Sequence, residues 1–244
     1  MFQKYFKSLY QRTMSEAYSL AHREIINSLK DGGDCLDCGA FSGQKYHLLK
    51  EMIDFPQGSY YGIEWNENLV LSARESNLNL IKGDLNKELV LPDNKFKCVF
   101  GLSVLEHLLN PCHYLKECYR VLETDGKLII LTPNISTYFT AVLILLGKMP
   151  SSGPHPDSDQ LVRQEEIFKV SSASLQPDTE TDTPVHRHLV VFSYRVLMSY
   201  CRSLGFTEVT GYGFGLYPFP NIMQPVLEKI DPYHCHQMVI IARK

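Results

Sequence analysis

The sequence predicts an α/β fold in which helices cover both faces of a doubly wound, mostly parallel sheet. Between residues 34 and 134, apolar strand-like runs alternate with segments of helical periodicity, as in βαβ units. The first run ends near Asp37 and passes into a glycine turn at Gly39 and Gly43. Such a turn lets a ligand approach the start of the following helix. In open sheets of this kind, ligands bind at the carboxyl ends of the strands.

The elements are expected in the following order. An amphipathic helix over 15–30 comes first, because its apolar residues recur at helical spacing. Strands are expected at 35–37, 59–64, 78–81, 96–102, 127–132, 206–212 and 237–242, and further helices at 44–52, 66–76, 113–122 and 192–204. The last two strands suit a β-hairpin with a long connection. Residues 141–146 are expected to form an ordinary buried helix rather than a lid over substrate.

We expect one domain over 1–244, in four parts. Residues 1–30 form an N-terminal helical cap, 31–134 a cofactor-binding core, 135–187 an insertion or lid, and 188–244 a C-terminal helix with strands. The insertion is expected because 146–184 is rich in Gly, Pro, Ser and Asp, and loops of such length are usually functional.

Composition narrows the class of protein. The formal net charge of −3 comes without any basic cluster, so we expect no nucleic-acid partner. The longest apolar run, 138–146, is too short to span a membrane, and the first residues lack the apolar core of a signal peptide. We therefore expect a cytoplasmic protein without stable membrane insertion. Seven cysteines fit reduced thiols, and the pair Cys35 and Cys38 is not expected to bind metal.

Two carboxylates follow strands where a nucleoside would need them. Glu64 ends the second strand and is placed to accept hydrogen bonds from two ribose hydroxyls. Asp84 follows the third strand, where it suits an exocyclic amine such as that of adenine. A phosphate-binding loop is not expected, because the turn at Gly39 and Gly43 matches neither G-x-G-x-x-G nor G-K-[ST].

Two longer motifs complete the pattern. The run 96–108 ends in Val-Leu-Glu-His-Leu, and the run 125–134 begins with Asp-Gly and ends in Thr-Pro-Asn. With the glycine turn, these motifs make the chain resemble a class I S-adenosylmethionine-dependent methyltransferase, strongly over 34–134 and again at His188 to Ser193 and Gly205. The resemblance implies a Rossmann-like, seven-stranded sheet with an antiparallel last strand. It also implies S-adenosyl-L-methionine as cofactor and S-adenosyl-L-homocysteine as product.

The resemblance assigns cofactor residues by matching position. The methionine half would be lined by Asp37, Gly39, Ala40 and Gly43, the ribose held by Glu64, the adenine by Asp84 and Leu85 with Trp65 against its face, and the sulfonium supported by Leu102 and Ser103. One position departs from the family pattern, because Phe41 stands where a glycine is usual. Two alternatives stay open: a non-catalytic cofactor-binding protein, and a nucleotide-dependent oxidoreductase on a similar sheet.

The reaction that the resemblance implies is in-line methyl transfer, most simply to oxygen of a small, partly apolar acceptor. His188 and His107 are the candidate bases. Each also has a structural interpretation, His107 with Glu106 at a helix N-terminus and His188 as a tie for the insertion. Tyr138, Phe214 and Tyr217 are candidate substrate contacts, and we expect a monomer or a homodimer.

Some relatives, including small-RNA end methyltransferases and certain quinone O-methyltransferases, hold a divalent metal with E-x-x-E-H. Here Ser103 replaces the first glutamate of that pattern. Because the loss of one oxygen ligand weakens a Mg²⁺ site, we expect no metal.

Overall fold

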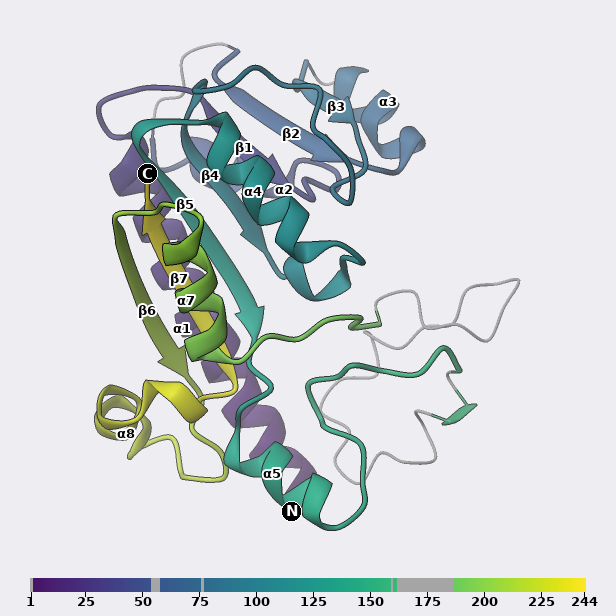
Figure 1. Ribbon diagram of the computed structural model, residues 1–244, viewed down its shortest axis with the longest axis vertical. Helices are drawn as coiled ribbons and strands as arrows, with labels where there is room; N and C mark the ends of the chain where they lie inside the picture. Colours follow the sequence, from purple (N-terminus) through teal and green to yellow (C-terminus); the bar gives the residue numbers. More distant parts are fainter. Residues whose placement is uncertain (1, 54–57, 76, 159, 162–186) are drawn as a thin grey trace.

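A seven-stranded sheet with the strand order β3-β2-β1-β4-β5-β7-β6 forms the centre of the molecule (Figure 1). The computed structural model describes residues 2–53, 58–75, 77–158, 160–161 and 187–244. The strands are β1 Cys35–Cys38, β2 Tyr60–Glu64, β3 Leu80–Lys82, β4 Phe96–Leu102, β5 Leu122–Pro133, β6 Glu208–Phe214 and β7 Gln237–Arg243. Strands β1 to β5 pair in parallel, whereas β7 runs antiparallel to both β5 and β6. The expected mostly parallel sheet with an antiparallel last strand is confirmed.

Helices cover both faces of this sheet. They are α1 Phe2–Leu29, α2 Gln44–Lys50, α3 Glu67–Glu75, α4 Pro111–Val121, α5 Tyr138–Leu145, α7 Tyr194–Ser203 and α8 Gln224–Ile230, with single 3₁₀ turns at Leu105–His107 and Pro232–His234. One apolar cluster joins α4 and α7 to one face of the sheet. A second joins α1, α2 and α3 to the other. Most of the sheet is therefore a middle layer covered on both faces, although alternate residues of the edge strand β6 are exposed.

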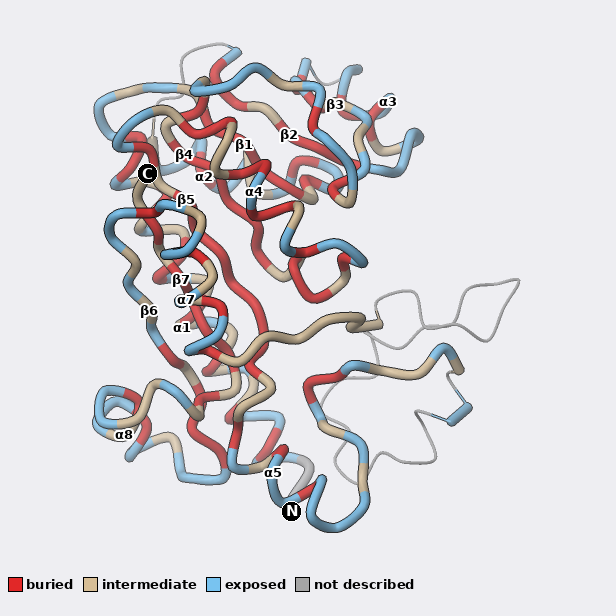
Figure 2. The backbone as a smooth tube through the Cα atoms, in the orientation of Figure 1, coloured by how far each residue is buried: buried red, intermediate tan, exposed pale blue. Residues whose placement is uncertain are grey.

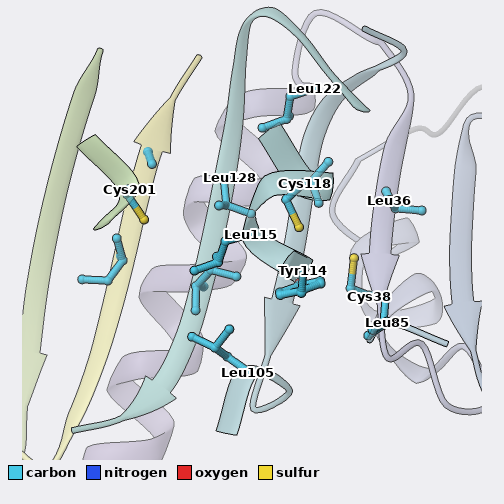
Figure 3. Packing of buried hydrophobic residues seen from close by; sticks show 14 of the residues in the cluster. Leu36, Cys38, Leu85, Leu105, Tyr114, Leu115, Cys118, Leu122, Leu128 and Cys201 are labelled. Carbon is cyan, nitrogen blue, oxygen red and sulfur yellow. The ribbon is translucent and has the colours of Figure 1, made fainter. Parts of the chain in front are cut away.

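Alternation along the strands feeds both clusters, as expected for strands buried on two sides. In β4, Val99 packs with the α4 side, whereas Cys98 and Phe100 pack with the α1 side. Figure 3 shows the α4 side, where Leu115 and other labelled side chains fill the space over β1, β4 and β5, and Cys201 of α7 lies beside β7.

Most element bounds agree with the sequence prediction within a few residues. The first helix is the main exception, because it begins at Phe2 rather than near residue 15. Its early part carries Phe6 and Leu9, which pack with Tyr217 from the far end of the chain. Tertiary contacts thus extend a helix whose own periodicity is weak there.

The prediction of a buried helix over 141–146 is wrong. Helix α5 forms, but only Thr140 and Leu143 on it are buried, and Leu145 is 85% exposed. Figure 2 shows most of α5 and α8 as exposed at the lower end of the molecule. Of the expected insertion over 135–187, residues 159 and 162–186 lie outside the described residues. No helix in the described ranges is both long and apolar enough to cross a membrane.

Candidate functional site

The turn after β1 is built from alternating residues with left-handed backbone. Gly39, Phe41 and Gly43 have φ values of 74°, 50° and 81°. A Cβ at Gly39 would lie 2.8 Å from Cγ2 of Val104, and a Cβ at Gly43 would lie 2.5 Å from Cδ1 of Leu78. Both glycines are therefore required by conformation and by space. The turn delivers the chain to the N-terminus of α2, with Gly43 as its N-cap residue.

Phe41 takes up the left-handed conformation that a glycine would adopt without strain. For a residue with a Cβ this costs roughly 1–2 kcal/mol. The phenyl ring is 54% exposed, so it does not fill the turn. The backbone N–H of Phe41 donates to Oε2 of Glu64 at 2.9 Å. This bond helps to keep Phe41 in its left-handed conformation. The backbone of the turn therefore has a conformation that glycine at this position could also adopt.

Glu64 ties the end of β2 to the turn. Its side chain is almost fully buried. Besides the bond from Phe41, Oε1 accepts from the backbone N–H of Asn66 at 2.9 Å. Each carboxylate oxygen can accept a second hydrogen bond. The side chain is thus fixed in place while capacity remains for ribose hydroxyls, and ribose binding by Glu64 stays a prediction.

Asp37 lies fully buried beneath the turn. Its Oδ2 accepts from the Tyr60 hydroxyl at 2.6 Å, and Nζ of Lys45 lies 3.4 Å from Oδ1. Lys45 also donates to the carbonyl oxygen of Gly39 at 3.2 Å. Burial raises the pKa of Asp37, and Lys45 and Tyr60 oppose that rise. Asp37 therefore braces the turn from inside, and the neighbouring Ala40 is equally buried.

Further candidate cofactor residues lie at or after the ends of β2, β3 and β4. Asp84 forms an Asx turn by accepting from the N–H of Asn86 at 2.9 Å, and this bond holds its pKa below the ordinary value. Leu85 and Leu102 are buried, whereas Trp65 is 78% exposed beside Glu64. An exposed indole in this place agrees with a side chain that packs only when a ligand is bound, but its contact with adenine stays a prediction.

A second group of polar side chains lies beyond β4 and is assembled from distant parts of the chain. His107 and His188 have ring centroids 5.1 Å apart, and His155 lies 4.9 Å from His188. Nδ1 of His107 is 3.0 Å from the carbonyl oxygen of Arg187, and Nδ1 of His188 is 2.5 Å from that of Ser152. Because a carbonyl only accepts, each Nδ1 carries the proton, which makes Nε2 the acceptor nitrogen of both rings.

Burial keeps these imidazoles neutral. The pKa of His188 is lowered to about 3, first by burial and then by the nearby histidines. Burial also lowers the pKa of His107 and of His155. Glu106, next to His107, accepts from the Thr132 hydroxyl at 2.9 Å and has its pKa raised to about 7 by burial. The pair Glu106–His107 lies in a 3₁₀ turn four residues before α4 begins, so the interpretation as a helix N-terminus is wrong.

Glu106, His107 and His188 can each direct a ligand atom so that the three atoms lie within 4.8 Å of one another. A buried carboxylate with two neutral imidazoles, each oriented through Nδ1 by a carbonyl, is a suitable donor set for a divalent cation. The expectation of no metal rested on Ser103 and did not include His188 as a third donor. Ser103 itself lies 3.2 Å from the Tyr18 hydroxyl.

Comparison with known proteins identifies the part of the chain that holds the first group. Residues 36–130 match the family model for a methyltransferase domain. A probable S-adenosylmethionine-dependent methyltransferase of Mycolicibacterium smegmatis is 30% identical over 109 residues, which cover 44% of this chain and 40% of that protein. A demethylmenaquinone methyltransferase of Listeria welshimeri is 32% identical over 110 residues, covering 38% and 46%.

The chain contains a class I S-adenosylmethionine-dependent methyltransferase domain. It spans less than half the length of these two relatives. A solved S-adenosylmethionine-dependent methyltransferase of Mesorhizobium loti shares the fold, with a TM-score of 0.57 at 14% identity, over 93% of this chain and 98% of that one. S-adenosylmethionine is the cofactor of this family, which leaves the oxidoreductase alternative without support.

The three candidate substrate contacts have different surroundings. Tyr217 is buried, donates to Oγ1 of Thr13 at 3.1 Å and stacks on His236. Tyr138 is 45% exposed and donates to Asp231 at 2.6 Å. Phe214 is half-buried against the α1 side of the sheet. A substrate contact stays a prediction for each.

Sequence reasoning missed several residues that shape the methyltransferase domain. Lys45 and Tyr60 fix Asp37, and no motif signals that role. Tyr18 reaches Ser103 from α1, which could have been noticed only from the helical spacing of Tyr10, Met14 and Tyr18.

Proposed function

We propose that this chain transfers the methyl group of S-adenosylmethionine to an oxygen of a small, partly apolar acceptor, with His188 and His107 as the proton-accepting groups. The observation that carries the proposal is the paired imidazoles, both oriented through Nδ1 and both held neutral, just beyond the end of β4. Strand β4 belongs to the matched methyltransferase domain.

The cofactor half of the proposal rests on backbone geometry. The turn at Gly39 and Gly43 and the fixed carboxylate of Glu64 meet at neighbouring strand ends. Methyl transfer from a sulfonium needs little more from the protein than orientation and exclusion of water. Gly39, Ala40 and Gly43 would face the methionine half, Glu64 the ribose, and Asp84 with Leu85 the adenine.

The acceptor half needs a place for one proton. As the methyl group moves to the acceptor oxygen, that oxygen loses its hydrogen to Nε2 of a neutral imidazole. The imidazolium that forms lies close to Glu106, whose pKa of about 7 allows the carboxylate to be present at neutral pH. An ionised carboxylate stabilises an adjacent imidazolium, which offsets the low pKa that burial gives His188.

The same three side chains suit a divalent cation, as their donor geometry shows. A cation bound there would occupy Nε2 of both imidazoles, so it would replace them as proton acceptors and would act instead by lowering the pKa of the acceptor hydroxyl. The test of the proposal therefore includes assays with a chelator and with added divalent cations.

An apolar acceptor is supported by two observations. Matched relatives include demethylmenaquinone methyltransferases, whose named substrate is a quinone. The elements that lie beyond the strand ends are rich in exposed apolar side chains, particularly α5. A non-catalytic cofactor-binding protein is the competing proposal, and only turnover separates the two.

The test has two stages. Titration calorimetry with S-adenosylhomocysteine, with NAD as control, measures cofactor binding by the full chain. Release of S-adenosylhomocysteine from S-adenosylmethionine is then followed with hydroxylated quinones and simple phenols. Each assay is run with EDTA and with added Mg²⁺, Mn²⁺ or Zn²⁺. We expect micromolar binding of S-adenosylhomocysteine alone, and turnover with at least one phenolic acceptor.

The variants His188→Ala and His107→Ala sharpen the assignment of the base. Each is expected to lower turnover about 10²-fold or more while cofactor affinity stays unchanged. His47→Ala, at an exposed histidine of α2, is the matched control. Full turnover by both variants would overturn the roles of His188 and His107. Tight cofactor binding without turnover on any acceptor would favour the non-catalytic protein.

A further inference from the structure

Three elements that are distant in sequence form one end of the molecule. The first turns of α1, helix α5 and helix α8 lie together at the lower end of Figure 1. Phe6 contacts Phe139 with ring centroids 5.8 Å apart, and the Tyr5 hydroxyl donates to the carbonyl oxygen of Pro218 at 2.7 Å. The Tyr138 hydroxyl donates to Asp231, just after α8, at 2.6 Å. These bonds make the end a single structural unit.

Many apolar side chains at this end of the molecule are exposed to solvent. On α5 and the residues that follow it, Val142, Leu145, Leu146 and Met149 recur at helical spacing and are 53%, 85%, 67% and 45% exposed. Around α8, Ile222, Val226 and Ile230 recur every four residues and are 89%, 62% and 72% exposed. Two apolar stripes at the same end of the molecule mark an interaction surface rather than scattered surface residues. We call these seven residues the apolar end.

The charges around the apolar end are arranged with the positive ones outward. Lys4 and Lys7 on α1 and Lys229 on α8 are exposed. The acidic groups nearby are already paired, since Glu228 forms an ion pair with Arg12 at 2.9 Å and Asp231 accepts from Tyr138 at 2.6 Å. The chain as a whole carries a net charge of −3, so a basic rim here is a local feature.

We propose that the apolar end docks on the surface of an anionic lipid membrane. Apolar stripes with a lysine rim match the acyl and headgroup layers of such a surface. A second copy of this chain fits less well, because symmetric contact through this end would bring the lysine rims together. Helix α5 has eight residues, which is too short to span a bilayer. The apolar end therefore lies in the interface and does not cross it.

The docking proposal is independent of the proposed function, because it concerns binding and not turnover. The full-length protein is mixed with vesicles of phosphatidylcholine alone or with one third phosphatidylglycerol, and bound protein is measured by flotation. We expect binding to the anionic vesicles, weak binding to the neutral ones, and loss of binding at high salt.

Two paired variants test the apolar end directly. Leu145→Glu with Leu146→Glu, and Ile222→Glu with Val226→Glu, should each lower vesicle partitioning by at least about tenfold, as the loss of two inserted apolar side chains predicts. Val90→Glu is the control, because Val90 is 96% exposed on the loop between β3 and β4. Each variant is expected to fold, because the substituted side chains are exposed to solvent in the native protein. Circular dichroism checks this.

Three outcomes would overturn the docking proposal. They are equal binding to neutral and anionic vesicles, unchanged partitioning of both paired variants, and a concentration-dependent dimer in light scattering that the paired variants dissociate. The last result would assign the apolar end to self-association.

Discussion

The two halves of the candidate site are built in different ways. Around the glycine turn, the key contacts are made by backbone groups within the first two βα units, such as the N–H groups of Phe41 and Asn66 that donate to Glu64. Around the histidines, the contacts join three separate stretches of chain: His107 is bonded to Arg187, 80 positions away, and His188 to Ser152, 36 positions away. The first half is encoded by local conformation, and the second exists only when the whole chain has folded. Substitutions should therefore affect the two halves differently.

The largest effect is expected where local conformation is forced. In Gly43→Val, the added Cβ meets Leu78 and the backbone must stay left-handed. We expect the free energy of unfolding to fall by about 2–4 kcal/mol and cofactor binding to be lost. Chemical denaturation and calorimetry measure the two effects. Gly32→Val is the control, because Gly32 has φ of 78° but open space around it. Equal destabilisation of both variants would show that crowding at Gly43 is unimportant.

Substitutions of Glu64 test whether this side chain binds the cofactor as well as stabilising the turn. Glu64→Ala should weaken binding of S-adenosylhomocysteine by about 1–3 kcal/mol, as the loss of charge-assisted hydrogen bonds predicts. Glu64→Gln keeps the shape and one acceptor oxygen, so it should retain more of the stability than of the affinity. Unchanged affinity in both variants would remove Glu64 from the ribose site.

The histidine half predicts a dependence of stability on pH. The folded protein holds the pKa of His188 at about 3 and that of His236 at about 4, below the ordinary value of 6.5. Between pH 6.5 and 4, these histidines bind protons in the unfolded chain but stay neutral in the folded chain. The free energy of unfolding therefore falls as pH falls through this range. Each histidine contributes up to about 1.4 kcal/mol per pH unit.

Glu106 acts with the opposite sign. Its folded pKa of about 7 lies above the ordinary value of 4.5, so its ionisation costs stability as pH rises between these values. Denaturation in EDTA at several pH values should still show a net loss in acid, because burial lowers the pKa of five described histidines and raises that of three described carboxyl groups, Glu16, Asp37 and Glu106. His188→Ala should flatten the acid side, and a wild-type slope in that variant would contradict the pKa assigned to His188.

The smallest effect is expected at Phe41. Phe41→Gly should raise the free energy of unfolding by about 1 kcal/mol, because glycine adopts the left-handed conformation without strain. Thermal denaturation measures the change. Phe41→Ala is the matched variant, since it removes the ring but keeps the strain. A gain in both variants would assign the effect to the exposed ring instead.

The cofactor half could be predicted because its signals are local. The run to Asp37, the glycines after it and Glu64 at the end of a strand are recognisable without knowledge of distant contacts. The sheet followed for the same reason, since apolar runs and helical spacing are properties of short segments. Phe41 could be recognised as a departure, but its left-handed φ could not be derived from its type.

The histidine half of the site could be predicted from the sequence only in part. The sequence indicates His107 and His188 as candidate bases, but no sequence pattern shows that two rings 81 positions apart are in contact. Likewise, the apolar sequence of α5 predicts a helix without showing what covers it. Burial depends on neighbours brought by the fold, and for α5 the apolar pattern suggested an interior position that the structure does not provide.

The seven cysteines, all within the described residues, differ sharply in accessibility. Cys112, at the start of α4, is the exposed one, and the other six are buried. Burial raises the pKa of Cys98 and of Cys201 to about 12. A maleimide dye should therefore react first with Cys112 in the native protein. The wild-type chain thus offers a ready-made attachment point for a fluorophore, on a helix outside both halves of the site, without any engineered cysteine.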